Sequence, residues 1–82
     1  MPASDNFRRN LQTVIKLRGL TQSEVAEAAG MVRPYVSRVL GGQTHPLMDQ
    51  AERLAKAVGY PLPSLLGNPE EFAELVLTSV SK

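Results

Sequence analysis

The sequence predicts an all-α fold of five short helices around one small core, followed by a sixth helix at the C-terminus. Apolar residues recur at intervals of three and four along almost the whole chain, and no alternating strand pattern competes with them. Glycines and prolines separate the periodic stretches, as is typical of helix ends. A chain of 82 residues forms one domain at most. Its small buried surface leaves little room for a deep cleft within one subunit.

The first three helices have clear boundaries. Ser4 or Asp5 can cap the start of the first helix, and Gly19 can end it. Its buried stripe is Phe7, Leu11, Val14 and Ile15. Thr21 and Glu24 form a capping box that starts a second helix of about two turns. That helix ends at Gly30 and buries Val25, Ala26 and Ala29.

The third helix runs from Arg33 to Leu40, with Pro34 in its first turn, where a missing N–H costs nothing. After a polar loop, a fourth helix spans about Leu47 to Val58 and stops at Gly59. A brief helix at residues 61–66 and a Gly-Asn-Pro break precede a last helix, Glu70 to about Val80. The expected inward positions are Val36, Val39, Met48, Ala51, Leu54, Ala55, Val58, Leu62, Leu65, Leu66, Phe72, Leu75, Val76 and Val80.

The composition excludes several classes of protein. The chain has no cysteine and one histidine, which excludes disulfide scaffolds, thiolate zinc sites, cysteine nucleophiles and a multi-histidine metal site within one chain. No apolar run approaches the roughly 18 residues of a membrane helix, and the first 30 residues lack the apolar core of a signal peptide. We therefore expect a cytoplasmic protein, with no catalytic residues, no cofactor, no metal and no enzymatic activity.

The charges are unevenly distributed, although the net charge is only +1. Residues 1–46 hold six lysines and arginines against three acids, whereas residues 47–82 hold three bases against five acids. This division indicates one side that faces a polyanion, or else a chance arrangement.

Residues 21–40 carry the pattern that points to function. Two short helices joined by a turn that begins at a glycine are typical of a helix-turn-helix. The predicted outer face of the third helix consists of Arg33, Pro34, Ser37 and Arg38. A guanidinium can bond O6 and N7 of guanine together, so two arginines on this face favour the reading of DNA. The competing interpretation is that both are ordinary solvated charges.

Three stretches stand together in this sequence. They are T-Q-S-E-V-A-E-A-A-G-M at residues 21–31, Y-V-S-R-V-L-G-G at residues 35–42 and L-A-K-A-V-G at residues 54–59. In this combination the chain resembles the Cro/phage-repressor (XRE-type) helix-turn-helix family over roughly residues 6–67. The resemblance implies a five-helix, lambda-repressor-like domain that binds double-stranded operator DNA, usually as a symmetric dimer.

The resemblance also implies roles for single residues. The start of the second helix braces a phosphate and can support a base contact, and the outer face of the third helix reads bases. Tyr35 stands at a position that often touches the DNA backbone, and the following loop lies along phosphates. The implied DNA-binding residues are Gln22, Arg33, Pro34, Tyr35, Ser37, Arg38, Gln43 and Thr44. Three positions depart from the family's pattern: Val32 and Leu47 stand where it often has a capping serine or threonine, and Leu40 replaces a frequent glutamate.

These observations predict a sequence-specific transcriptional regulator, most simply a repressor that binds a palindromic operator as a homodimer. We divide the chain into a helix-turn-helix domain at residues 1–67 and a C-terminal helix at residues 68–82. The apolar stripe of that helix is either a cap on the core or a dimer seam, and we favour the seam. The same acidic helix supports an alternative function, an antitoxin-like or adaptor protein whose main role is to bind a protein partner.

Overall fold

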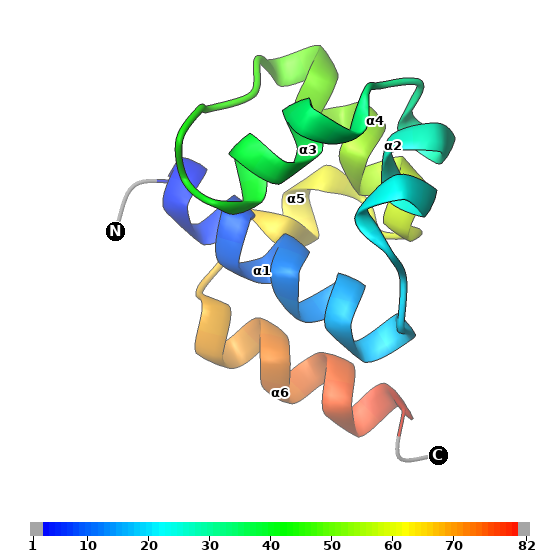
Figure 1. The fold of residues 1–82 in the computed structure, drawn as a ribbon. Coiled ribbons are helices and arrows are strands. Elements are labelled where there is room, and N and C mark those ends of the chain that lie inside the picture. Colours follow the sequence, from blue (N-terminus) through cyan, green and yellow to red (C-terminus); the bar gives the residue numbers. More distant parts are fainter. Residues whose placement is uncertain (1–2, 81–82) are drawn as a thin grey trace.

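The computed structural model describes the backbone of residues 3–80 and the side chains of residues 5–78. Within that range the regular secondary structure is all helix, with no strand, which confirms the predicted fold class (Figure 1). The helices are α1 (Ala3–Arg18), α2 (Gln22–Ala29), α3 (Arg33–Leu40), α4 (Met48–Val58), α5 (Leu62–Leu65) and α6 (Pro69–Val80). All but α5 span at least two turns.

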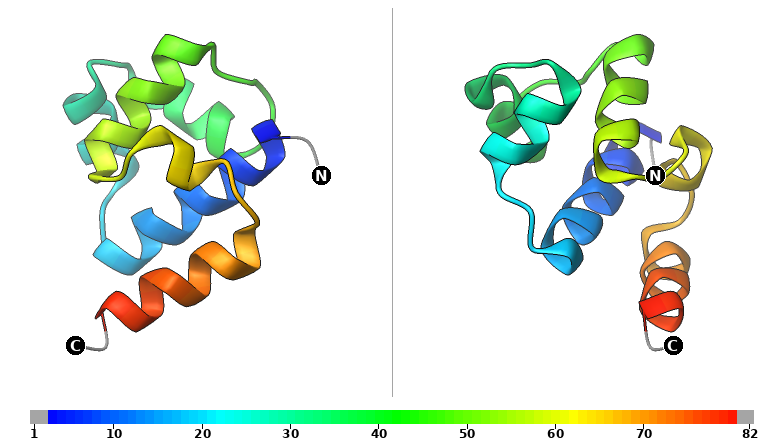
Figure 2. Two further views of the ribbon diagram at one scale, coloured as in Figure 1. Left: turned by 180° about the vertical axis from the view of Figure 1, so that it is seen from behind. Right: turned by 90° about the vertical axis from the view of Figure 1, so that its right-hand side faces the viewer.

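One hydrophobic core joins all six helices, and α1 lies at its centre. In Figure 1, α3 lies on one side of α1 and α6 on the other. The right-hand view of Figure 2 places α2 and α3 on one side of the molecule and α5 and α6 on the opposite side. The buried apolar residues are Phe7, Leu11, Val14, Ile15, Val25, Ala26, Ala29, Val36, Val39, Ala51, Leu54, Ala55, Val58, Leu65, Phe72 and Val76. Every inward position predicted for the first three helices is therefore confirmed.

Two predictions for the helix starts are wrong. Ser4 and Asp5 do not cap α1, because the helix already includes Ala3 and both residues lie in its first turn. Asp5 instead accepts a hydrogen bond at 2.7 Å from Nη2 of Arg8, and this bond holds the pKa of the Asp5 carboxyl below its ordinary value. Met48 was expected inside but is 68% exposed, because it is the first residue of α4, three positions before Ala51 reaches the core.

Two asparagines of α1 hold the segment between α5 and α6. Asn10 is fully buried, and its Nδ2 donates to the backbone oxygens of Leu65 at 2.9 Å and Gly67 at 3.0 Å. Asn6 donates from Nδ2 to the oxygen of Leu66 at 3.3 Å. These bonds satisfy carbonyls at the end of α5 that would otherwise lack partners, and they fix where α6 begins.

The last helix contributes more to the core than the sequence predicted. Phe72 is 5% exposed and Val76 is 3% exposed, so the core does not close near Leu66. Leu75 is 71% exposed, which shows that the predicted stripe divides into an inner and an outer part. The side chain of Val80 lies outside the described residues.

The start of α6 also differs slightly from the prediction. The helix begins at Pro69, one residue earlier than expected. Oδ1 of Asn68 accepts hydrogen bonds from the backbone nitrogens of Glu70 at 2.9 Å and Glu71 at 3.2 Å. Asn68 is therefore an N-cap, and the proline at the first helical position loses no hydrogen bond by lacking its N–H.

The inner and outer parts of α6 should respond differently to truncation. Phe72→Ala should lower the free energy of unfolding by about 3 kcal/mol, because it leaves a cavity in the core. Leu75→Ala, its matched control on the same helix, should change it by less than about 0.5 kcal/mol. Urea unfolding followed by circular dichroism measures both, and equally small effects would mean that α6 does not pack on the core in solution.

Candidate nucleic-acid interface

The start of α2 is fixed by the predicted capping box, which the structure confirms. The backbone nitrogen of Glu24 donates to Oγ1 of Thr21 at 3.1 Å, and the nitrogen of Thr21 donates to Oε1 of Glu24 at 2.8 Å. Both residues satisfy N–H groups that have no partner within the helix. The first helical residue after this cap is Gln22, whose side chain is half-buried.

The turn between α2 and α3 is held by a residue that sequence reasoning missed. Arg53 of α4 donates from Nε to the oxygen of Ala29 at 3.0 Å and from Nη2 to the oxygen of Gly30 at 2.9 Å. Gly30 has φ +70°, as the turn requires, and a Cβ there would lie 2.9 Å from Nη2 of Arg53. No local signal marks this contact, because the partners lie more than 20 residues apart.

The outer face of α3 is exposed as predicted. Val36 and Val39 are buried, and the exposed residues of this helix are Arg33, Pro34, Ser37 and Arg38. Across the described part of the chain, no ion pair or hydrogen bond holds the side chain of Arg33. Residues 28–48 contain no aspartate or glutamate, so the charges of this face are positive.

Tyr35 has partners within the protein. Its ring is half-buried and packs against the core, and its hydroxyl donates to Oε1 of Gln50 at 2.7 Å. Cζ of Arg38 lies 5.9 Å from the centroid of the same ring, which is within the range of a cation–π interaction. Tyr35 therefore serves at least in part as a packing residue within the protein.

Gln22 and Ser37 lie on the wall of one shallow hollow between α1, α2 and α3. Lys16 of α1 lines the same hollow and adds a positive charge to it. Gln43 and Thr44 lie apart from this group, in the loop that leads from α3 to α4. Gln43 is exposed and Thr44 is half-buried, so both can be reached from solvent. Gln22 therefore lies beside α3, whereas Gln43 and Thr44 lie beyond the C-terminal end of α3.

The three departures from the family's pattern have visible consequences. Val32 precedes α3 with no side-chain capping bond and is 66% exposed. Leu40 is half-buried against the core. Leu47 has no side-chain acceptor either, but its backbone nitrogen donates to Oε1 of Gln50 at 3.1 Å. The fourth helix therefore keeps half of a capping box.

The described residues offer neither a metal site nor a membrane-spanning helix. No group of three or more histidine, cysteine, aspartate or glutamate side chains there could hold a metal ion. None of the described helices is long and apolar enough to cross a membrane.

Comparison with known proteins adds one finding. A family model described as "Helix-turn-helix" matches residues 11–65, which is more than half of the chain. The match covers α2, the turn and α3 completely. No curated protein matched the chain.

The turn geometry predicts a specific glycine requirement. Gly30→Ala should lower the free energy of unfolding by about 1–2 kcal/mol, because a side chain in this left-handed conformation is strained and displaces Arg53. Gly67→Ala is the control, since its backbone lies outside the positive-φ region and the space around it is open. Equal unfolding midpoints for the two variants would show that the turn does not adopt this conformation.

Proposed function

Because the chain belongs to the Cro/phage-repressor (XRE-type) helix-turn-helix family of DNA-binding regulators, we propose that it is a sequence-specific cytoplasmic repressor that binds a palindromic operator as a homodimer. The observation that carries this proposal is the outer face of α3, where Arg33 and Arg38 are exposed and no acidic residue is near in sequence. Buried positions on the opposite face of α3 hold it firmly against the core.

The proposed mechanism divides the site between phosphates and bases. Gln22, Gln43 and Thr44 contact the DNA backbone, which fixes the register and supplies affinity. Arg33 and Arg38 discriminate base pairs, since each guanidinium can bond two acceptors of a guanine in the major groove. Pro34 and Ser37 complete the surface that enters the groove, and Tyr35 contacts the DNA backbone beside it. Occupancy of the operator then blocks access of the polymerase.

A dimer is proposed because one small domain buries too little DNA for tight binding, about 600–1,000 Å² for single modules of this kind. The proposed seam is the outer part of α6, where Leu75 is exposed. Since α3 and α6 lie on opposite sides of α1, pairing along α6 leaves α3, the proposed recognition helix, uncovered in both protomers (Figure 1). Both must also face the same side of the duplex, which makes the operator an inverted repeat.

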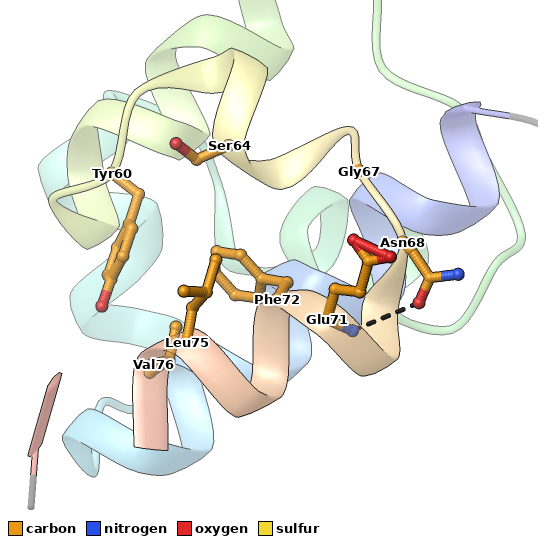
Figure 3. A pocket seen from close by; sticks show the side chains of 8 residues that line it. All are labelled: Tyr60, Ser64, Gly67, Asn68, Glu71, Phe72, Leu75 and Val76. Carbon is orange, nitrogen blue, oxygen red and sulfur yellow. Dashed lines mark hydrogen bonds between the residues drawn. The ribbon is translucent and has the colours of Figure 1, made fainter. Parts of the chain in front are cut away.

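A second candidate function has its own supporting observation. A groove between α5 and α6 is lined in part by Tyr60, Phe72, Leu75 and Val76, whose side chains gather in Figure 3. It lies on the side of the molecule opposite α2 and α3 (Figure 2). A protein partner in this groove would leave the α3 face free, as expected of an antitoxin-like or adaptor protein.

The two arginines should carry base preference. A bidentate contact to guanine is worth about 1–3 kcal/mol of discrimination, so Arg33→Ala and Arg38→Ala should each relax preference at one base pair per half-site. Gln22→Ala and Thr44→Ala are the controls and should weaken operator and scrambled duplex more evenly, because phosphates look alike in every sequence. The operator comes from selection among random duplexes, and affinities are compared at one fixed salt concentration.

Unchanged operator preference in both arginine variants would mean that α3 does not read bases. The partner-binding function would then be the better conclusion.

The dimer should be visible without DNA and in the selected sequences. We expect sedimentation to show a dimer at micromolar concentration, and selected sites to be inverted repeats with half-site centres about 34 Å apart. Leu75→Glu should shift the chain towards monomer and weaken operator binding while leaving its unfolding transition in place, since Leu75 is exposed. A monomer at high micromolar concentration, together with asymmetric selected sites, would contradict the dimer.

A further inference from the structure

Gln50 connects the start of α4 to the recognition helix. Its Oε1 accepts hydrogen bonds from the hydroxyl of Tyr35 at 2.7 Å and from the backbone nitrogen of Leu47 at 3.1 Å. The ring of Tyr35 in turn lies under the guanidinium of Arg38, with 5.9 Å between Cζ and the ring centroid. These contacts form a continuous path from the first turn of α4 to the outer face of α3.

We propose that Gln50 is a positioning residue that orients Arg38 through the ring of Tyr35 and so sharpens the choice of the base pair that Arg38 reads. The inference rests on the proposed function, because it assigns Gln50 a part in base reading. It adds a residue that lies outside the recognition helix and outside the set of eight DNA-binding residues predicted from the sequence.

The chemistry of the amide fixes its orientation. A backbone N–H can only donate, so the group that faces Leu47 must be the side-chain oxygen of Gln50. The hydroxyl of Tyr35 then donates to the same oxygen, and both bonds restrain the carboxamide. A glutamate at this position could accept both bonds as well, whereas an alanine could accept neither.

The restrained ring limits the conformations of Arg38. A free arginine side chain loses rotamer entropy when it is ordered, and bidentate contact with guanine requires a planar group in one orientation. A ring within cation–π distance of the guanidinium favours some of these conformations over others and so reduces this loss before DNA arrives. Without the bond from Gln50, the half-buried ring of Tyr35 keeps its packing but loses the contact that fixes its hydroxyl end.

Arg33 provides an internal comparison. It lies on the same helix and the same exposed face, yet no hydrogen bond, ion pair or ring contact connects its side chain to Gln50 or Tyr35 among the residues the structure describes. Loss of the Gln50 contact should therefore affect the base pair read by Arg38 and spare the base pair read by Arg33. A residue that only caps α4 would affect both alike.

The first test measures base preference at each operator position by competition with singly substituted duplexes. Gln50→Ala and Tyr35→Phe should each reduce discrimination at the Arg38 base pair about three- to tenfold, and change the Arg33 base pair less than about twofold. Gln50→Glu should retain discrimination, because it keeps the acceptor. Tyr35→Phe removes only the hydroxyl, so the ring packing and the fold should remain.

A double-mutant cycle gives the deciding result. In an Arg38→Ala background Gln50→Ala should have no further effect on base preference, whereas in an Arg33→Ala background its effect should persist in full. Equal loss of preference at both base pairs, or equal loss of affinity for every duplex, would overturn the inference and leave Gln50 as a cap of α4. If Arg38→Ala loses preference and Gln50→Ala does not, the inference alone fails. If neither arginine variant loses preference, the proposed function fails and the inference with it.

Discussion

The rotational setting of α3 is the constraint on which the candidate site depends. Val36 and Val39 are buried in the same core as α1, and a helix turns by about 100° per residue. Burial of these two positions directs Ser37 and Arg38 outward, and it leaves Arg33, about 60° around the helix from Val36, exposed at the edge of the same face. The valines are β-branched and restricted in rotamer, so the helix rests on a well-defined contact rather than on flexible side chains. A polar residue at either position would turn or detach the helix that presents Arg33 and Arg38.

Local signals in the sequence predicted most of the fold. The capping box of Thr21 and the stop at Gly30 depend on neighbours within three residues or on a single backbone angle, so a short window contains all the information. Contacts between distant segments could not be found in this way. Three hydrogen bonds join residues that are distant in the sequence: Arg53 bonds to the turn after α2, Asn10 bonds to the end of α5, and Tyr35 bonds to Gln50. Hydrophobic periodicity does not predict the paths of the loops that bring these partners together.

The last helix illustrates the limit of periodicity. Phe72, Leu75 and Val76 lie on one broad stripe, with Leu75 on one side of Phe72 and Val76 on the other, about 100° apart around the helix axis. Which flank is buried depends on where α1 runs beneath the helix, and here it is the flank of Val76. The rings of Phe72 and Tyr60 also pack in a T-shaped arrangement with centroids 5.5 Å apart, and Arg18 lies over the ring of Tyr60. The core thus continues past residue 67, and only the outer flank of α6 remains for the proposed dimer seam.

Mapping the backbone amides that respond to DNA shows which face of the chain binds, before any residue is changed. The measurement is a nuclear magnetic resonance titration of the ¹⁵N-labelled chain with a duplex selected for binding. We expect the largest shift changes in α3, in the first turn of α2 and in the loop at residues 41–46. Changes concentrated along α5 and α6, with α3 unaffected, would contradict the assignment of the outer face of α3 as the DNA-reading surface.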